Sequence, residues 1–502
     1  MDRGPYLLGV DVGTTGTKTM LFSAQNGLLS TARETYELQT PCEGRSEQAP
    51  EDWWTAVVKT VREVCRALPR GGQVTALSLS LQGGTLVVTD KNFHPLRPAV
   101  VWNDHRCTQE ANRFRERFGG QYLYEHSGWQ LGKGLNALQI LWLREHEREI
   151  FNTAAYFLSV PDYISAKLTG IPALDLSNAG INQLLDLSTG AYNQEVLDFI
   201  GITEERLGHL VPSGEVIGRL TAHAASELGL TEETLLVSGA HDQYAVAAGA
   251  GCGKAGDVLI GTGTAWVVTA LSGCPNFSSG FSQSVAAGEG VWGSLVSMPS
   301  GGISLEWFRK KLASTGEPLS YEDIDRLASA SAVGARGVMF HPYFSGSPRP
   351  EPEGTARAAL TGLDLSHTNA DIARAVKEGV TFQMAWILEQ FREHFPITRL
   401  LLSGGAAKSA LWSQIIAEVT GMPLRVPEAA DLACVGAAVL AGKGSGVFAS
   451  LEEGQRRLSV GSREIIPDPA RTAVYQELFE EYKDTARYLN ELYRSRRKKG
   501  DR

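Results

Sequence analysis

The sequence predicts an α/β protein made of two related domains. Short apolar strands alternate with helical patterns along the chain, which is typical of layered α/β folds. A strand, a Gly/Thr turn and a second strand occur at 7–23, and the same order returns at 257–268. Gly261 of the second turn lies 248 residues after Gly13 of the first, close to half of the 502-residue length. A match at half-length indicates an internal duplication.

The first half begins with the strands expected at 7–12 and 18–23. A helix follows from Pro50, because apolar residues recur there at helical spacing. The apolar run 74–81 predicts a buried strand that ends at Gln82-Gly83-Gly84, and 86–89 predicts the next strand. This order supports an α/β layer in the first domain.

In the second half, an apolar strand at 235–238 leads into a helix of small residues. The repeated turn follows, and helices are expected from near Asn369 and over 409–420. The segment 251–256 satisfies G-x-G-x-x-G, but it precedes a strand instead of following one, so we expect a loop and not a dinucleotide site. The expected division is an N-terminal domain at 1–245, a C-terminal domain at 246–492 and a basic tail at 493–502.

Charge and cysteine content exclude several classes of function. The net charge of −9 and the pI of about 5.7 argue against a nucleic-acid surface, and the basic run 494–499 is expected to be a solvated tail. The six cysteines are far apart and form no CxxC pair, so no disulfide framework or zinc site is expected. Without a signal peptide pattern or an apolar segment of about 20 residues, we expect a cytoplasmic enzyme without a membrane partner.

The first turn carries residues suited to a polyphosphate. Glycine lets backbone N–H groups approach a ligand, threonine adds hydroxyl groups and Lys18 adds a positive charge. Asp11 has the wrong sign to contact phosphate, so its expected partner is Mg²⁺ or the water around it. The alternative is a plain hairpin of good turn residues. The second turn at mid-chain favours the functional interpretation.

Two further carboxylates are candidates for the site. Asp242 follows the strand at 235–238, where it is either a helix N-cap or a catalytic carboxylate, and the local sequence alone favours the cap. His241 beside it is expected to be structural. Asp104 and Arg106 follow an apolar strand and form either a surface ion pair or a site for a polyhydroxy ligand.

Eight segments in order resemble the FGGY family of carbohydrate kinases, which phosphorylate sugars, ketoses and polyols with ATP. The resemblance covers about residues 6 to 490. The segments are DVGTTGTK at 11–18, PAVVWNDHR at 98–106, LNALQILWLREHE at 135–147, VPDYISAKLTG at 160–170, GAHDQYAVAAGAG at 239–251, VLIGTGTAWVV at 258–268, AALTGLDLSHTNADIARAV at 358–376 and LSGGAAKSALWSQIIAEVTG at 402–421. The resemblance implies two ribonuclease-H-like domains of the actin/hexokinase type, with an interdomain cleft.

The resemblance also implies roles for particular residues. Asp242 would be the catalytic base, and Asp11 and Asp242 would lie near Mg²⁺. The residues implied for ATP are Gly13, Thr14, Thr15, Lys18, Gly261, Thr262, Gly263, Gly301, Gly302, Gly404, Gly405 and Ala406. The residues implied for the sugar are Gln82, Gly83, Gly84, Asp104, Arg106, Tyr163 and Gln243. The N-terminal domain would mainly bind sugar and the C-terminal domain mainly nucleotide, and a homodimer is the family-level expectation.

The sequence differs from xylulose kinases at a position that bears on the substrate. Xylulose kinases carry Gln-Met-His-Gly where this chain has Gln82-Gly83-Gly84-Thr85, so the pocket should be roomier or filled from elsewhere. Gln243 after the candidate base is similar to glycerol kinases. Xylulose or another pentulose is the leading substrate, and a glycerol or polyol kinase is the alternative within the family. An actin- or chaperone-like ATPase that binds a protein partner and a non-catalytic sugar sensor are the alternatives outside it.

Overall fold

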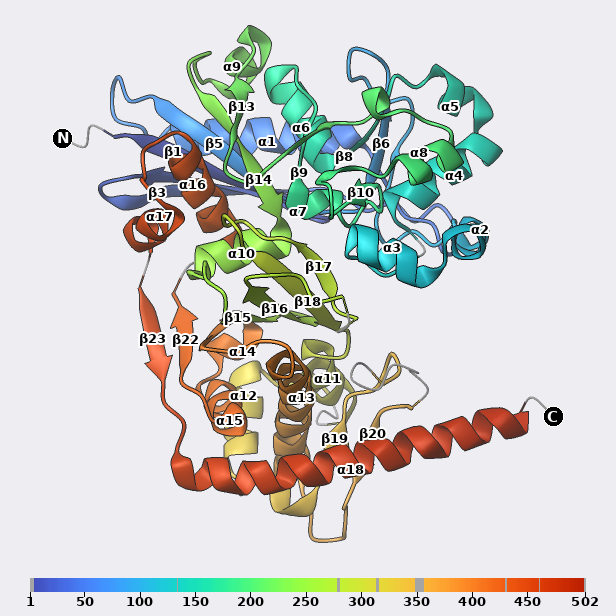
Figure 1. Ribbon diagram of the computed structural model, residues 1–502. Helices are drawn as coiled ribbons and strands as arrows, with labels where there is room; N and C mark the ends of the chain where they lie inside the picture. The colour runs from blue at the N-terminus through green and yellow to red at the C-terminus, as the bar shows by residue number, and fades with distance from the viewer. Residues whose placement is uncertain are drawn as a thin grey trace. The chain divides into compact units, whose positions relative to one another are not determined.

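The computed structural model describes residues 4–132, 134–277, 280–312, 316–347, 356–428, 431–459 and 461–500 (Figure 1). The chain forms two compact units. The first comprises Met1–Ala255, Leu271–Ser294 and Ala429–Val460, and the second comprises Gly256–Ala270, Leu295–Glu428 and Gly461–Arg502. Both units are therefore discontinuous in sequence, whereas the expected domains 1–245 and 246–492 are continuous.

A six-stranded sheet in the order β13-β14-β5-β1-β2-β3 forms the centre of the first unit. Strand β1 pairs antiparallel with β2 and parallel with β5, which in turn pairs parallel with β14. Strands β2 and β3 pair antiparallel, as do β13 and β14. The bounds are β1 Tyr6–Val12, β2 Gly16–Ser23, β3 Gly27–Thr35, β5 Val74–Leu81, β13 Val216–Arg219 and β14 Leu235–His241.

The second large sheet repeats this pattern and confirms the duplication. Its order is β17-β18-β16-β15-β21-β22-β23. Strand β15 pairs antiparallel with β16 and parallel with β21, β21 pairs parallel with β22, and β22 pairs antiparallel with β23. The bounds are β15 Asp257–Thr262, β16 Trp266–Ser272, β17 Ser282–Val285, β18 Trp292–Met298, β21 Arg399–Gly404, β22 Leu424–Pro427 and β23 Ser462–Ile465.

Strand β1 is apolar on both faces because helices cover both sides of its sheet. Leu8, Val10 and Val12 belong to a core with helix α1 (Pro50–Cys65), α6 (Val160–Thr169) and α9 (Ala222–Leu228). Leu7 belongs to the opposite core, with helix α16 (Leu432–Gly444) and α17 (Leu451–Leu458). This alternation is the period-2 geometry of a strand buried on both sides.

Helix α16 lies close to strand β1 and to helix α10 (Asp242–Ala250). A Cβ atom at Gly436 would lie 1.9 Å from the Ala245 carbonyl oxygen, and one at Gly9 would lie 1.8 Å from that of Cys434. Only glycine permits these backbone approaches. The small-residue composition of α10 and α16 thus allows α16 to pack closely on both α10 and β1.

The other elements of the first unit surround this sheet. A four-stranded sheet in the order β4-β7-β6-β8 lies among the helices that precede α6. Its bounds are β4 Glu47–Gln48, β6 Leu86–Thr89, β7 Ala99–Val100 and β8 Tyr156–Ser159. The helices are α2 Thr108–Phe118, α3 Gly120–Ser127, α4 Asn136–His146, α5 Arg148–Thr153, α7 Leu176–Ala179, α8 Gln194–Ile200 and η1 Glu204–Arg206. Short strand pairs are β9 Ala173–Asp175 with β12 His209–Val211, and β10 Leu185–Asp186 with β11 Ala191–Tyr192.

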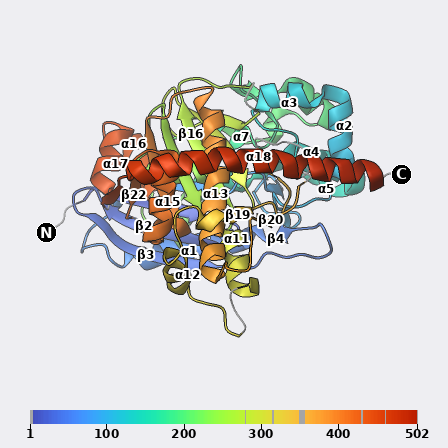
Figure 2. The same ribbon diagram turned by 90° about the horizontal axis from the view of Figure 1, so that it is seen from below.

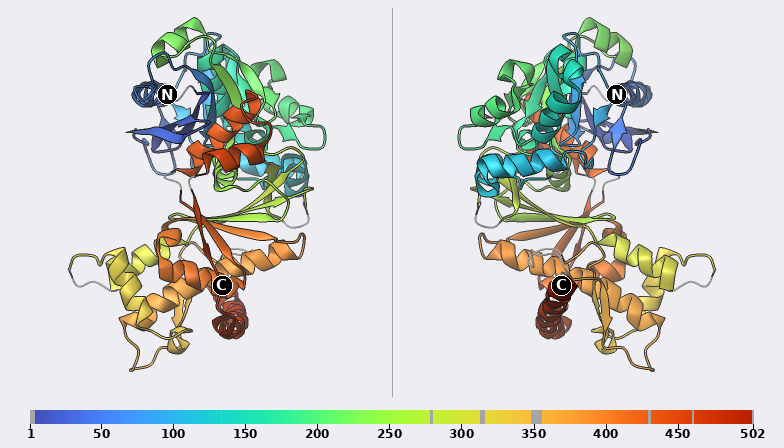
Figure 3. Two further views of the ribbon diagram at one scale, coloured as in Figure 1. Left: turned by 90° about the vertical axis from the view of Figure 1, so that its left-hand side faces the viewer. Right: turned by 90° about the vertical axis from the view of Figure 1, so that its right-hand side faces the viewer.

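In the second unit, helix α13 (Asn369–Arg392) packs against α12 (Tyr321–Ser329), α15 (Ala410–Thr420) and α18 (Pro469–Gly500). Figure 2 shows α18 crossing α13, and both panels of Figure 3 look along the axis of α18. The remaining elements are α11 Gly302–Trp307, η2 Phe308–Leu312, η3 Ala335–Gly337, β19 Met339–His341, β20 Ala359–Thr361 and α14 Gly405–Lys408.

Most of the predicted elements are confirmed. The helix from Pro50, the strands 74–81 and 86–89, the helix from Asn369 and the helix ending at 420 are all present. Residues 251–256 lie between α10 and β15, as expected of a loop. The basic residues expected in a solvated tail continue helix α18 as far as Gly500, and 501–502 lie outside the described residues. All six cysteines are free, and none of the described helices is long and apolar enough to span a membrane.

Candidate active site

Three neighbouring strands of the first sheet end in one register row. Leu81 of β5 pairs with Val12 of β1 on one side and with His241 of β14 on the other. The residues that follow are Gly13, Gln82 and Asp242, so the sheet brings the first Gly/Thr turn, the Gln82 loop and the start of α10 to one edge. The carboxyl ends of parallel strands are where α/β sheets commonly bind ligands.

Side chains from outside the first Gly/Thr turn (residues 13–16) hold its carbonyl groups. The Tyr36 hydroxyl donates to the Gly13 carbonyl oxygen at 2.6 Å, and Gln48 Nε2 donates to the Thr14 carbonyl oxygen at 2.7 Å. The Thr14 hydroxyl donates to Gln82 Oε1 at 2.9 Å. Thr15 is exposed at the tip. These bonds fix the peptide planes of the turn, which presets the direction of its N–H groups.

Asp11 and Lys18 are cross-strand partners, and Asp431 completes their cluster. Lys18 Nζ lies 2.5 Å from Asp431 Oδ2 and 4.0 Å from Asp11 Oδ2. Ser80 Oγ donates to Asp11 Oδ1 at 2.8 Å. Asp431 is also the N-cap of α16, where Oδ1 accepts from the Cys434 N–H.

Burial and like charges perturb this cluster. Burial, together with the Asp431 and Asp242 carboxylates, raises the pKa of Asp11 to about 7 against the opposing effects of Ser80 and Lys18. Burial lowers the pKa of Lys18, but its hydrogen bond and ion pair with Asp431 outweigh that effect, so the pKa is raised overall. Around Asp11, the negative charges of the carboxylates therefore outweigh the single positive charge of Lys18.

Asp242 is not the N-cap of helix α10, so the cap interpretation is wrong. Strand β14 extends to His241, and the His241 side chain caps the helix by accepting from the Gln243 N–H. Asp242 is the first helical residue, with 38% of its side chain exposed and Oδ1 3.2 Å from His241 Nδ1. A carboxylate at this position is free to face solvent or a ligand, while the helix N-terminus favours its negative charge.

A buried polar cluster anchors His241. The His241 N–H donates to Ser177 Oγ at 2.8 Å, and the Ser177 hydroxyl bonds to Asp175. Asp175 also caps the short helix α7 through the Asn178 N–H. The expectation that His241 is structural agrees with its role as a cap, and its fixed backbone sets the direction in which Asp242 leaves the strand.

The Gln82 loop lies directly beside this anchor. A Cβ atom at Gly83 would lie 2.8 Å from Ile181, 2.9 Å from Asn178 and 3.0 Å from the His241 ring. The sequence left two alternatives for this position, a roomier pocket or a pocket filled by other residues. At Gly83 the structure shows the second, because these three side chains occupy the space. Gly84 has φ of +74°, which favours glycine.

Trp102 is an exposed aromatic residue beside the same loop. Its indole Nε1 donates to Thr14 Oγ1 at 3.2 Å, and 49% of the residue is exposed. Trp102 therefore presents an open aromatic surface beside the first turn and the Gln82 loop. Trp102 belongs to the segment 98–106, but sequence reasoning did not single it out.

Asp104 and Arg106 form a buried pair, so the surface ion-pair interpretation is wrong. Asp104 is 0% exposed and accepts from the Ser46 N–H, the Arg106 N–H and the Arg106 guanidinium at 2.7–2.9 Å. Arg106 also donates to Glu47 and lies over the Trp142 ring. The Asp104 carboxylate is fully occupied by these bonds, and a direct sugar contact from it remains a prediction.

The other sugar candidates differ in exposure. Gln82 is nearly enclosed, and its Nε2 has no hydrogen-bond partner among the described residues. Gln243 is half-buried beside Asp242. Tyr163 is 0% exposed, its ring packs with apolar side chains in the core of the first sheet, and a sugar contact from it remains a prediction.

In the second unit, the second Gly/Thr turn lies against the Gly404-Gly405 turn. Thr262 pairs with Gly404, its hydroxyl donates to the Ser403 carbonyl oxygen at 2.5 Å, and it accepts from the Ala406 N–H at 2.9 Å. A Cβ at Gly404, whose φ is +89°, would lie 2.5 Å from the Thr262 carbonyl oxygen. The two turns are therefore bonded into one surface.

Gly301 and Gly302 complete this surface. A Cβ at Gly301 would lie 2.3 Å from the Trp266 ring, and one at Gly302 would lie 2.3 Å from the Gly263 carbonyl oxygen. The sequence thus places glycine where α11 begins against the second turn. The structure brings together the candidates 261–263, 301–302 and 404–406 within the second unit.

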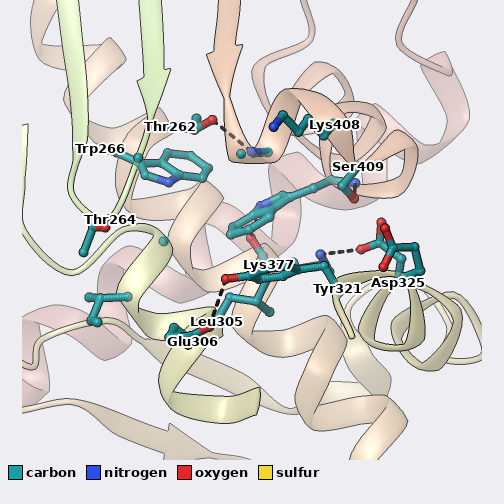
Figure 4. A pocket seen from close by; sticks show the side chains of 17 residues that line it. Thr262, Thr264, Trp266, Leu305, Glu306, Tyr321, Asp325, Lys377, Lys408 and Ser409 are labelled. Atoms are coloured by element: carbon teal, nitrogen blue, oxygen red, sulfur yellow. Dashed lines mark hydrogen bonds and ion pairs between the residues drawn. The ribbon is translucent and has the colours of Figure 1, made fainter. Parts of the chain in front are cut away.

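A cavity of about 610 Å³ opens beside these glycines (Figure 4). The volume is in the range of small-molecule sites. The walls are formed by Thr262, Gly263, Thr264, Trp266, Gly302, Ile303, Leu305, Glu306, Tyr321, Glu322, Asp325, Lys377, Gly405, Ala406, Lys408, Ser409 and Trp412. Sequence reasoning missed Trp266, Trp412, Lys377 and the contribution of α12.

Charged side chains line part of the cavity wall. Lys377 Nζ lies 2.7 Å from Asp325 Oδ1 and 4.4 Å from the centroid of the Trp412 ring. Burial lowers the pKa of Lys377, while Asp325 opposes that effect. The Tyr321 hydroxyl donates to Glu306, whose bonds to Arg309 and Lys310 lower its pKa to about 2. The cavity combines tryptophan, aliphatic and charged surfaces.

Comparison with known proteins assigns the chain to a family. Residues 6–249 match the N-terminal domain of the FGGY family of carbohydrate kinases, and residues 257–445 match its C-terminal domain. A xylulose kinase of Bacillus subtilis is 31% identical over 493 residues, covering 97% of this chain and 98% of the relative. A gluconokinase of the same species is 28% identical over 447 residues, covering 87% and 86%.

Solved structures agree with this assignment. The xylulose kinase from Rhodospirillum rubrum has a TM-score of 0.91 at 26% identity, covering 97% of this chain and all of that one. Plasmodium falciparum glycerol kinase with ADP has a TM-score of 0.85 at 19% identity, covering 96% and 98%, and shows the fold alone. The expected two-domain fold of the actin/hexokinase type is confirmed. The chain is therefore a member of the FGGY family of carbohydrate kinases.

Proposed function

We propose that this carbohydrate kinase transfers the γ-phosphoryl group of ATP to a hydroxyl group of a ketose or polyol, with Asp242 as the general base. The register row Val12–Leu81–His241 is the observation that carries the proposal. It brings a partly exposed carboxylate, a turn suited to phosphate and the Gln82 loop to one edge of one sheet. The alternative of an ATPase that binds a protein partner gives no reason for the Gln82 loop and Trp102.

Asp242 would accept the proton of the attacking sugar hydroxyl. A sugar hydroxyl is a weak nucleophile, and a positioned base typically contributes about 10²–10⁴ to the rate. Oxygen then attacks the γ-phosphorus, the bond to the β-phosphate oxygen breaks, and ADP leaves. Holding the hydroxyl and the phosphoryl group in line supplies much of the remaining effect.

The first turn would bind phosphate mainly through its backbone. The Thr14 hydroxyl is already bonded to Gln82 and Trp102, so the N–H groups of Thr14 and Thr15 and the ammonium of Lys18 are the proposed donors. The second turn, with Gly261, Thr262 and Gly263, is proposed as a further phosphate contact. Its backbone is fixed by the bonds of Thr262 to Ser403 and Ala406.

Mg²⁺ is proposed as the ion that accompanies ATP. The raised pKa of Asp11, caused by burial and by the Asp431 and Asp242 charges, fits a carboxylate cluster that a divalent cation would neutralise. Asp11 and Asp242 would hold the ion through carboxylate oxygens. When bound, the ion supplies positive charge to the phosphate oxygens.

The cavity of the second unit is proposed to take the nucleoside of ATP. Gly405 and Ala406 line it, as does Gly302, and apolar side chains offer a surface for a flat base. Residues 1–245 are thereby proposed as the sugar-binding part and 246–492 as the nucleotide-binding part.

Xylulose or another pentulose is the proposed substrate, because the relatives named above include xylulose kinases. The filled space at Gly83 and the exposed Trp102 give the sugar site a shape of its own. ADP release with ketopentoses, ketohexoses, gluconate and glycerol in Mg²⁺-ATP would identify the substrate. Sugar-independent ATP hydrolysis as fast as any stimulated rate would contradict the kinase assignment.

A further inference from the structure

Lys377 is fully enclosed in the wall of the cavity, yet most of its hydrogen-bonding capacity is unused. Its relative exposure is 0%, and an ammonium group has three donors. Within the described part of the chain, Asp325 Oδ1 at 2.7 Å is the only ion-pair partner of Nζ. The Asp325 side chain is itself 28% exposed, so its carboxylate is open to the cavity.

Arg374, a second buried cation on the same helix, is an example of a purely structural ion pair. Arg374 lies one turn before Lys377 in α13 and donates to Glu378, to the Ser331 carbonyl oxygen and to the Tyr475 hydroxyl. Its donors are distributed over three partners, as a buried charge requires. The Lys377 ammonium group has fewer partners, namely the Asp325 carboxylate and the face of the Trp412 ring, and both of these residues line the cavity.

The rest of the cavity fits a flat heterocycle. Trp266, Ile303, Leu305 and Trp412 form apolar walls, and the glycines at 302 and 405 let a ring approach the backbone. In Figure 4, Lys377 and Asp325 are joined by a dashed line at the side of the cavity away from Thr262. The pair therefore presents the Asp325 carboxylate, an acceptor, at the cavity edge, with Lys377 Nζ enclosed behind it.

We propose that Asp325 recognises the base of the nucleotide, with its carboxylate accepting from the 6-amino group of adenine while the enclosed Lys377 Nζ holds that carboxylate in place. This inference rests on the proposal that the cavity takes the nucleoside of ATP. The 6-amino group of adenine is a hydrogen-bond donor, which matches the exposed carboxylate of Asp325. Guanine and hypoxanthine carry an oxygen at position 6, which would face the carboxylate and leave it unpaired.

The matched ligands are ATP, purine riboside triphosphate, which lacks the 6-amino group, and ITP, in which oxygen replaces it. Dissociation constants are measured on the full chain with Mg²⁺ and without sugar, by tryptophan fluorescence or calorimetry. We expect the wild type to bind ATP at least about tenfold more tightly than either analogue, because a site built for a hydrogen bond rejects a ligand without it.

The variants are Asp325→Asn, the double variant Lys377→Met with Asp325→Asn, and Asp484→Asn on the exposed side of α18 as the control. Asp325→Asn should narrow the ATP-to-ITP ratio, since an amide can donate to the oxygen of ITP. The double variant removes the buried charge and should bind the three nucleotides within about threefold. The control should keep the wild-type ratio. Thermal unfolding checks that each variant is folded.

The results separate this inference from the function on which it rests. ATP binding with wild-type ratios in the folded variants would show that the pair is only structural and would overturn the inference alone. Equal wild-type binding of ATP and purine riboside triphosphate would overturn it as well, even if the double variant failed to fold. If the wild type bound none of the three nucleotides, the proposed function of the cavity would fail too.

Discussion

Lys18 and Asp431 are 413 positions apart in the sequence, and Lys18 Nζ lies 2.5 Å from Asp431 Oδ2. Asp431 also caps α16, so one carboxylate both begins a helix and holds the ammonium group beside the first turn. The pair fixes the position of the ammonium group, although 39% of the Lys18 side chain is exposed. It sets the charge balance around Asp11.

Removing the Lys18 charge should lower the catalytic efficiency of the enzyme with ATP. We expect Lys18→Met to lower kcat/KM for ATP by roughly 10- to 1,000-fold, because charge-assisted contacts to phosphate are strong. The sugar KM should change much less. Steady-state kinetics with each substrate varied measures both effects. Lys59→Met, on an exposed ion pair with Glu34, is the control and should stay within about twofold of wild type.

Asp242→Asn should remove the proposed base while keeping its shape. The expected result is a fall in kcat of about 10²–10⁴-fold. Nucleotide binding, followed by calorimetry, should persist because the backbone of α10 is held by His241 and Ser177. Asp198→Asn on helix α8 is the matched control. Full sugar phosphorylation by Asp242→Asn would rule out the base assignment.

Gly83→Ala tests whether the filled space beside the Gln82 loop matters. The added Cβ would lie within 3.0 Å of Ile181, Asn178 and His241, so these groups must move. We expect the sugar KM to rise by about tenfold or more and kcat to fall, because His241 positions Asp242. Gly120→Ala in helix α3 is the control, since nothing lies within 4 Å of its added Cβ. A Gly83→Ala variant with wild-type kcat and sugar KM would contradict the assignment of the Gln82 loop to the sugar site.

The free energy of unfolding should fall as the pH rises, because the buried carboxyl group of Asp162 titrates. Burial raises the pKa of Asp162 to about 7 from an ordinary value of 3.8, despite its bonds in the capping box with Ser159. The folded state therefore holds a proton that the unfolded state has released between these values. Its contribution to stability is complete below pH 4 and is lost progressively as the pH rises to about 7.

Asp162→Asn should remove this dependence, because asparagine can still accept from the Ser159 N–H but does not titrate. Unfolding midpoints at pH 5 and pH 8 measure the effect. Between these pH values the wild type should lose up to roughly 3 kcal/mol more than the variant. Asp198→Asn, on the surface, should follow the wild type. An identical pH dependence in Asp162→Asn would show that the carboxyl group is ionised throughout.

The local sequence was sufficient to predict the strands, the turns and the helices of small residues. The duplicated hairpin, the strand 74–81 and the glycine turns at 261–263 and 404–406 were predictable because their signals are contained in a few neighbouring residues. Asp242 was identified as a candidate, but its relation to the helix was not, because the extension of β14 to His241 depends on pairing with Leu81. Burial of Asp104 was unpredictable for a similar reason, since Ser46 and Trp142 come from distant segments.

Several site residues carried no separate signal. Asp431 precedes an apolar helix, which indicates an N-cap but not a partnership with Lys18. Tyr36, which directly follows β3, and Gln48 in β4 support the first turn from segments outside it. Lys377 lies within a helical pattern in which a charged residue would be assigned to the surface. In each case the missing information is the long-range packing of elements.

The packing of α16 on β1 has a consequence for how the protein is made. Leu7, Met20 and Phe22 are synthesised more than 400 residues before Val435 and Val439, which are among the side chains that cover them. One face of the first sheet must therefore remain open until helix α16 is synthesised. Protection of the nascent chain, by a chaperone or by the ribosome itself, thus matters most before residue 432 emerges.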